Sequence, residues 1–201
     1  MNFKKITVFF LIFFILIITI YAQDEDIEVY DSKYDLGDQT FSIRAGLFLP
    51  LFFMSPSLSF SSTNLSIGGI GALEWNTYIN NRITLGGELS GMFAFSPNAR
   101  ILYMIPLVFK AAYHFRKYPF EFPISCGAGV SFNTIGDSFH ADFILKPGAS
   151  VLWNFNHEWA FGVNAVYWWI PQIYSGSGKV PSSHTMFGNF LETTLSAMFR
   201  F

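Results

Sequence analysis

Residues 82–95 read RITLGGELSGMFAF, and their apolar side chains fall on every second position. The odd-numbered positions carry only apolar residues or glycine, whereas the even-numbered ones include Arg82, Thr84, Glu88 and Ser90. A period of two is typical of a β-strand with one apolar and one polar face. The same pattern marks seven further segments: 41–53, 66–79, 101–115, 121–133, 141–155, 158–170 and 187–201.

The length of these segments favours a membrane over a soluble sandwich. A tilted strand crosses a bilayer with about 9–11 residues, whereas strands of globular proteins commonly have about five or six. Of the 201 residues, 51% are hydrophobic and 13% are charged, and the mean hydropathy is +0.35. This composition excludes a disordered chain. Only residues 6–20 form a long apolar run, which excludes a polytopic helical membrane protein.

The remaining classes are a very apolar soluble β protein and a membrane barrel, whose apolar content is spread over alternate residues. We predict an all-β fold: an eight-stranded antiparallel up-and-down transmembrane β-barrel over residues 40–201. Pairing of 41–53 with 187–201 would close it.

Residues 1–22 have the layout of a secretory signal peptide. Lys4 and Lys5 precede the apolar residues 6–20, and Ala22 is the expected cleavage residue. An uncleaved anchor helix is the alternative, although fifteen residues are short for a span. Cys126 is the only cysteine, so an exported chain would have no internal disulfide.

Residues 23–39 hold seven acidic residues against a single lysine, and we interpret them as a solvated periplasmic segment. A calcium-binding role for Asp24, Glu25 and Asp26 is the alternative, but no EF-hand spacing follows them.

The connections between strands predict the orientation. Residues 80–81, 116–120 and 156–157 are short connections, whereas 54–65 and 171–186 are long and rich in Ser, Pro and Gly. In bacterial barrels short turns face the periplasm and long loops face outward. An even number of strands then places both termini in the periplasm.

Aromatic residues lie near both ends of the strands on the outward face, as in the two girdles of a membrane barrel. Those near the periplasmic ends are Trp75, Tyr113, Phe115, Phe122, Trp153, Phe155, Trp159, Phe199 and Phe201. Those near the outer ends are Phe53, Phe93, Phe95, Tyr103, Phe132, Tyr167, Trp169 and Phe187. Core aromatics of a soluble sandwich would not gather at both strand ends.

Two prolines disagree with uninterrupted strands. Pro106 and Pro147 lie in mid-segment, where each removes one hydrogen-bond donor from the ladder. We therefore expect a bulge or a local break at each, and the register could shift by one residue.

This pattern resembles the small eight-stranded bacterial outer-membrane proteins, the group with the OmpA transmembrane domain, OmpX and OmpW. The resemblance covers residues 40–201 and rests on strand count, parity and the ending LSAMFRF. In that group the barrel-insertion machinery reads outward apolar residues and a final aromatic in the last strand. The resemblance implies this role for Leu195, Ala197, Phe199 and Phe201, with outer-membrane lipids as the surroundings.

The residues that alternate with the outward-facing ones along each strand are predicted to line the lumen. Its mid-barrel charges are three of each sign: Arg44, Glu74, Glu88, Lys110, Lys146 and Glu192. Counted from the strand ends, three pairs lie at similar depth: Arg44 with Glu74, Glu88 with Lys110, and Lys146 with Glu192. An eight-stranded barrel is just wide enough to be filled by side chains, so we expect these charges to be paired. They would form either a gate or polar constriction, or a packing network that seals the barrel.

Above this layer the inward positions become apolar: Phe48, Ile70, Met92, Leu102, Met104, Ile144, Val166, Trp168, Ile170 and Phe190. A polar porin lumen is not lined in this way. Such residues could hold or pass a small hydrophobic molecule, as the resemblance to OmpW-like proteins implies, or could simply fill the space.

Signs of catalysis are weak. Some barrel enzymes of the outer membrane act on lipids through a Ser and His pair, and this chain has Ser183 beside His184. Adjacency in sequence, however, does not make a nucleophile and its base. His114, His140 and His157 have no metal-ligand spacing, and an isolated histidine near a strand end is commonly an interfacial polar residue. Basic residues are few and scattered, which argues against nucleic-acid binding. We expect a non-enzymatic membrane protein without a cofactor, either structural or surface-interacting.

Overall fold

The structure is a computed structural model that describes residues 34–96, 100–136, 138–173 and 185–201. The expected signal peptide and most of the acidic segment lie outside these ranges, as do Ser183 and His184. The strands are β1 (Gln39–Met54), β2 (Phe60–Ser61), β3 (Gly68–Tyr78), β4 (Ile83–Phe95), β5 (Ile101–Lys117), β6 (Phe120–Ile135), β7 (Ser138–Asn154), β8 (Trp159–Gln172) and β9 (Met186–Arg200). Within the described ranges no helix is long and apolar enough to cross a membrane.

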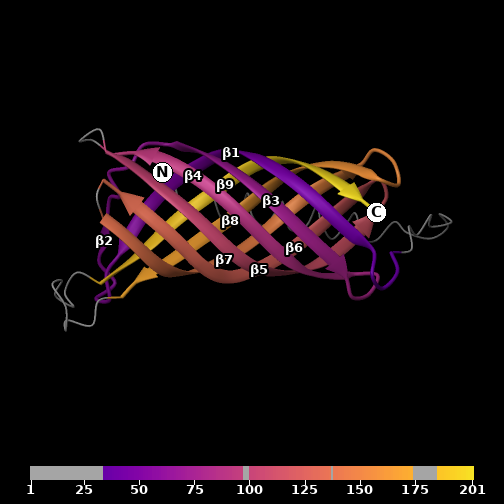
Figure 1. Cartoon of the computed structure of the whole chain (residues 1–201), viewed down its shortest axis with the longest axis horizontal. Coiled ribbons are helices and arrows are strands. Elements are labelled where there is room, and N and C mark those ends of the chain that lie inside the picture. Colours follow the sequence, from indigo (N-terminus) through magenta and orange to yellow (C-terminus); the bar gives the residue numbers. More distant parts are fainter. Residues whose placement is uncertain (1–33, 97–99, 137, 174–184) are drawn as a thin grey trace, which may run out of the picture. The chain divides into compact units, whose positions relative to one another are not determined.

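Eight of these strands form a closed antiparallel barrel, which confirms the predicted fold. Each strand from β3 to β8 pairs with the next in the chain, and β1 pairs with both β3 and β9 (Figure 1). The closing seam aligns Phe41 with Phe199 and Ala45 with Leu195. The two-residue strand β2 pairs only with the end of β1, so it extends the sheet beyond the barrel wall.

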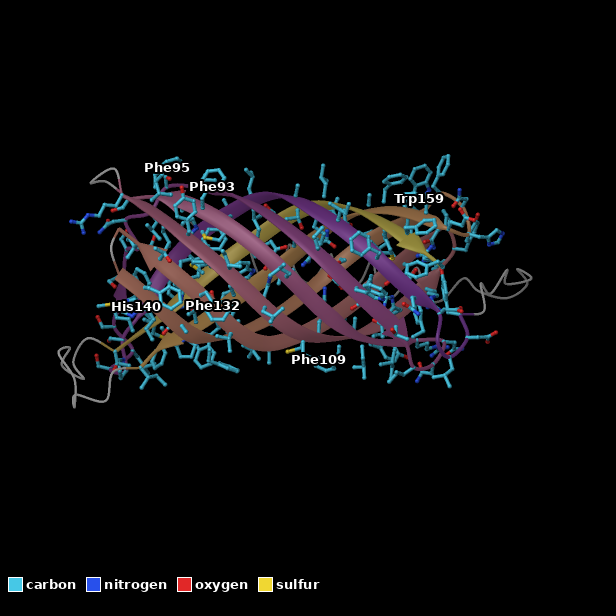
Figure 2. All side chains as sticks on the ribbon, in the orientation of Figure 1. Phe93, Phe95, Phe109, Phe132, His140 and Trp159 are labelled. Atoms are coloured by element: carbon cyan, nitrogen blue, oxygen red, sulfur yellow. The ribbon has the colours of Figure 1, made fainter. Side chains whose placement is uncertain are left out.

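Alternation along each strand separates the inside of the barrel from the outside. In β5, Leu107 and Phe109 are 58% and 64% exposed, whereas the intervening Val108 is buried. Exposed aromatic residues gather at both ends: Figure 2 shows Phe93 and Phe95 toward one end of the barrel and Trp159 toward the other. A belt of exposed apolar side chains around a closed barrel is the surface that a bilayer accommodates.

The two mid-strand prolines break the ladder without shifting its register. Pro106 still pairs with Ser131 of β6, while pairing between β4 and β5 skips from Leu89–Leu107 to Met92–Met104. Pro147 still pairs with β6, and the β7–β8 ladder skips in the same way beside it. Successive residues of a strand direct their N–H groups to opposite neighbours, so a proline weakens the pairing with only one of them. The register is therefore preserved on both sides.

The register shift lies elsewhere, in β1. Pairing with β9 moves by one residue between Pro50 and Phe52, as in a β-bulge. Beyond the bulge Phe53 packs against the buried Phe190, with ring centroids 6.2 Å apart. Our assignment of Phe53 to the outward aromatic girdle was therefore wrong, because one extra residue reverses the parity of everything after it.

A charge placed on the apolar belt tests this arrangement. Phe109 lies at the centre of β5 and faces outward, so we expect Phe109→Arg to lower the free energy of unfolding in lipid vesicles by about 2–4 kcal/mol. Urea titration of the reconstituted protein measures this, with Phe109→Leu as the control that keeps an apolar side chain. Equal stability of the arginine and leucine variants would contradict a lipid-facing belt.

Candidate functional site

The barrel interior carries the predicted polar side chains in one layer. Six buried charges from six different strands contact one another there: Arg44, Glu74, Glu88, Lys110, Lys146 and Glu192. We call this set the ionic layer. The three pairs expected from equal depth are all in contact: Arg44–Glu74 at 3.6 Å, Lys110–Glu88 at 3.9 Å and Lys146–Glu192 at 3.2 Å.

Two residues act as centres of the ionic layer. The Arg44 guanidinium forms ion pairs with Glu88, with Glu192 at 3.4 Å and with Glu74. Glu88 in turn forms ion pairs with Lys146, Arg44 and Lys110. The shortest contacts therefore join strands that are not neighbours in the sheet, in addition to the pairs that we predicted.

Neighbouring polar groups complete the layer. Lys110 Nζ donates to Glu74 Oε2 at 2.8 Å, and Asn76 Nδ2 donates to the other Glu74 oxygen at 2.8 Å. Trp168 Nε1 donates to Glu192 at 2.9 Å. A buried carboxylate is tolerated only when several donors replace its hydration, and these contacts supply them.

The apolar residues predicted for the upper lumen form a packed plug on one side of the ionic layer. Phe48, Ile70, Met92, Met104, Ile144, Val166, Trp168, Ile170 and Phe190 belong to one buried cluster, with Leu102 packed against it. The Phe48 ring lies 5.2 Å from Trp168 and 5.0 Å from Phe190. Phe48 and Trp168 have no exposed surface, so side chains fill this section of the lumen.

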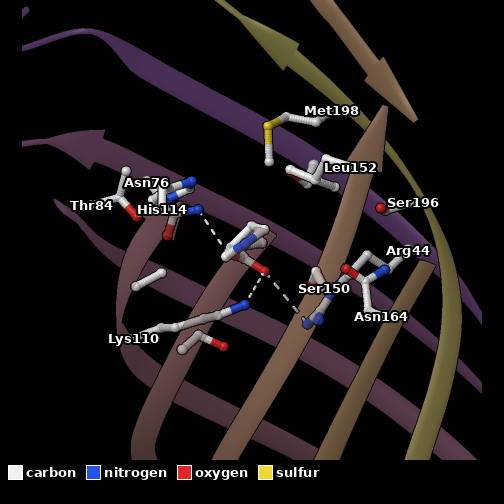
Figure 3. Close-up of a pocket in the computed structure, with 15 residues that line it drawn as sticks. Arg44, Asn76, Thr84, Lys110, His114, Ser150, Leu152, Asn164, Ser196 and Met198 are labelled. Carbon is white, nitrogen blue, oxygen red and sulfur yellow. Dashed lines mark hydrogen bonds and ion pairs between the residues drawn. The ribbon is translucent and has the colours of Figure 1, made fainter. Parts of the chain in front are cut away.

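On the other side of the ionic layer lies a polar chamber of about 30 Å³, to which all eight barrel strands contribute (Figure 3). It is lined by Ser42, Arg44, Glu74, Asn76, Thr84, Lys110, Ala112, His114, Pro123, Ser125, Ser150, Leu152, Asn164, Ser196 and Met198. A void of this size accommodates a water molecule or a small ion.

A second charged cluster closes the chamber at the end where the described chain begins and ends. Glu121 Oε1 lies 2.5 Å from His114 Nδ1 and 3.4 Å from Arg116 Nε, and Arg200 donates to Glu121 Oε2 at 2.9 Å. We call His114, Arg116, Glu121 and Arg200 the basal cluster. His114 Nε2 also lies 3.0 Å from the Thr84 hydroxyl. This histidine is therefore a buried, bonded residue, and its interpretation as an isolated interfacial group was wrong.

Tyr34 covers the basal cluster. Its ring stacks on Tyr78 with centroids 4.6 Å apart, and the Arg116 guanidinium lies 4.0 Å from its centre. We had interpreted residues 23–39 as solvated, yet Tyr34 is buried. The inward parity of Glu121 and Arg200 could have revealed the basal cluster, but Tyr34 precedes the first strand and carries no periodic signal.

The residues matched to the assembly signal lie on the outward side of β9, next to the closing seam. Leu195 and Phe201 are 68% and 57% exposed, and Phe199 stacks on Phe201 with centroids 5.9 Å apart. Ala197 pairs with Ile43 of β1. Their role in assembly stays a prediction. Among the described residues, no three His, Cys, Asp or Glu side chains are arranged to hold a metal ion.

Comparison with known proteins gives a family and a fold. A family model matches residues 21–199. A protein of Borreliella burgdorferi, named only as an uncharacterized protein, is 32% identical over 165 residues, covering 71% of this chain and 77% of the relative. The chain therefore belongs to the family that this model describes.

Two solved structures share the fold of this family member. Neisserial surface protein A (NspA) matches with a TM-score of 0.61 and 13% identity, over 82% of this chain and 97% of NspA. The outer membrane protein OprG of Pseudomonas aeruginosa matches with a TM-score of 0.50 and 10% identity, over 85% of this chain and 98% of OprG. The predicted resemblance to small outer-membrane barrels is thereby confirmed, and at this identity it concerns the fold alone.

Removing one carboxylate from the ionic layer should be costly. Glu88→Ala removes one of the two carboxylates that Arg44 and Lys146 share and leaves Glu192 alone between them, so we expect a loss of about 3–5 kcal/mol in the free energy of unfolding. Urea unfolding in lipid vesicles measures it. Glu158→Ala is the matched control, because Glu158 is exposed in the β7–β8 turn and its removal should change stability by at most about 0.5 kcal/mol. Similar values for the two variants would refute a stabilising layer.

Proposed function

We propose that the protein is an integral outer-membrane barrel with a sealed lumen that serves a structural or surface-interacting role and is not an enzyme. The observation that carries this proposal is the apolar plug packed directly against the ionic layer. Phe48 and Trp168 fill the lumen on one side, and Arg44 and Glu88 bridge it on the other. A barrel filled in this way supports no aqueous path along its axis.

The orientation proposed for the barrel places both termini in the periplasm. Short turns after β3, β5 and β7 lie at the barrel end where β1 begins and β9 ends, and the segment from Ser55 to Ile67 connects β1 and β3 at the opposite end. Short turns are periplasmic in bacterial barrels. The apolar outward side of β9 supports outer-membrane lipids and the barrel-insertion machinery as partners.

A planar-bilayer recording tests the sealed lumen. We expect no single-channel steps from the reconstituted protein, whereas Phe48→Ala combined with Trp168→Ala and Tyr34→Ala should admit ions, because it removes two rings of the plug and the ring that covers the basal cluster. Phe109→Ala is the matched control, since it removes an outward-facing ring and should produce no conductance steps. Regular conductance steps from the unaltered protein would overturn the proposal.

Surface labelling of intact cells tests the orientation and the membrane together. A cysteine introduced at Ser57 should react with an impermeant maleimide, and one introduced at Asn81 should react only after lysis. Both positions are exposed in connections at opposite barrel ends. The Cys126→Ser background removes the native thiol, which is exposed. Labelling of the Asn81 position in intact cells would contradict the orientation, and a soluble, detergent-independent monomer would contradict the membrane assignment.

A conduit for small hydrophobic molecules is the second candidate, and an interruption of the β7–β8 ladder favours it, although Gln172 Nε2 still donates to Asp142 Oδ2 at 3.4 Å there. Pairing between β7 and β8 stops at Leu145–Trp169, although the strands themselves continue to Ser138 and Gln172. Ile144 and Ile170 of the plug adjoin this unpaired stretch. A lateral route would need the two strand ends to separate, so a disulfide between Asp142→Cys and Gln172→Cys would block it and would leave a sealed scaffold unaffected.

A further inference from the structure

The polar chamber contains buried hydrogen-bond donors that lack acceptors. The hydroxyls of Ser42 and Ser196 and the Nε of Arg44 are buried, and within the described part of the chain none of these atoms has a hydrogen-bond partner. Arg44 Nε also takes no part in the ion pairs of that side chain, which run through its two terminal nitrogens. Leaving a buried donor without an acceptor is unfavourable, so three of them around one void indicate an occupant that accepts hydrogen bonds.

These three groups come from one side of the chamber. Arg44 is the direct cross-strand partner of Ser196, and Ser42 lies two residues before Arg44 on the same face of β1. All three line the void, which Figure 3 shows with Arg44 and Ser196 labelled. An arginine N–H can only donate, and a serine hydroxyl can donate, so the set is suited to an acceptor and unsuited to a metal cation.

The charges around the chamber favour an anion. The charged residues of its lining, Arg44, Lys110 and Glu74, all belong to the ionic layer and are paired within it. The ionic layer on one side is formally neutral, with three cations and three carboxylates. Among the described residues, the basal cluster on the other side holds the two arginines Arg116 and Arg200 against the single carboxylate of Glu121, so the positive excess beside the chamber comes from this cluster. An uncompensated charge in a poorly hydrated interior is stabilised by a counter-ion.

We propose that the chamber binds one small monovalent anion of halide size, held by Arg44 Nε and by the hydroxyls of Ser42 and Ser196. The volume of about 30 Å³ accommodates a single ion of this kind and leaves no space for a large organic anion. The bound ion offsets the excess positive charge and satisfies the three donors together. This site is independent of the proposed membrane role, because it concerns only the barrel interior.

Diffraction with bromide tests the site on the unaltered protein. Crystals of the detergent-solubilised full chain grown with bromide as the only halide should show an anomalous peak within hydrogen-bonding distance of Arg44, Ser42 and Ser196. Ordinary water density at this position, without anomalous signal, would overturn the proposal.

Thermal unfolding gives a second readout and a matched pair of variants. At equal ionic strength, potassium bromide at about a hundred times its dissociation constant should raise the Tm by about 5–10 °C relative to potassium gluconate. Ser42→Ala combined with Ser196→Ala should remove this difference. Ser131→Ala should keep it, because Ser131 is equally buried but bonds Asn133 and lies outside the chamber lining. The absence of a bromide effect in the unaltered protein, or its persistence in the double variant, would refute the site.

Discussion

Ion pairing inside a narrow barrel is the interaction on which the rest of this structure depends. An eight-stranded barrel has no room for bulk water beside its own side chains, so each inward charge must find its partner among the other strands. Arg44 and Glu88 do so at the centre, and the ionic layer they organise links six of the eight strands. A slip of one residue in any of these strands would turn its charge to the outside. The paired charges therefore hold the register of the wall as well as filling the lumen.

The alternation of side chains made most of the fold and much of the interior predictable. A period of two assigns each residue to the inside or the outside, so the eight strands, their closure and the inward position of charges such as Lys110 and Glu192 follow from the sequence. Depth counted along neighbouring strands also brings the expected pairs together. It does not reveal which contacts are shortest, because long side chains such as Arg44 reach past their own level to carboxylates on other strands.

Features that break the period were not predictable in the same way. The bulge between Pro50 and Phe52 adds one residue and turns Phe53 toward the plug; Pro50 was the one local signal for it, because prolines within strands are commonly found at bulges. The contact of Arg200 with Glu121 joins β9 to β6, which are not neighbours in the sheet, so no rule on adjacent strands connects them. Tyr34 belongs to no strand at all. For Arg200 and Tyr34 the deciding contact is long-range, and local pattern carries no information about it.

The order of the layers limits how any molecule could pass through this barrel. The apolar plug and the ionic layer are joined by Lys146, whose ammonium lies 4.1 Å from the centre of the Trp168 ring while it pairs with Glu88 and Glu192. Tyr34 and the basal cluster form a second barrier beyond the polar chamber. Opening either barrier alone leaves the other in place, so an axial pore requires two separate rearrangements. The ends of β7 and β8 beyond Leu145–Trp169 adjoin the plug from the side, so a route between them would avoid the ionic layer and the basal cluster. The second candidate function, passage of a small apolar molecule, therefore requires a lateral route and not an axial channel.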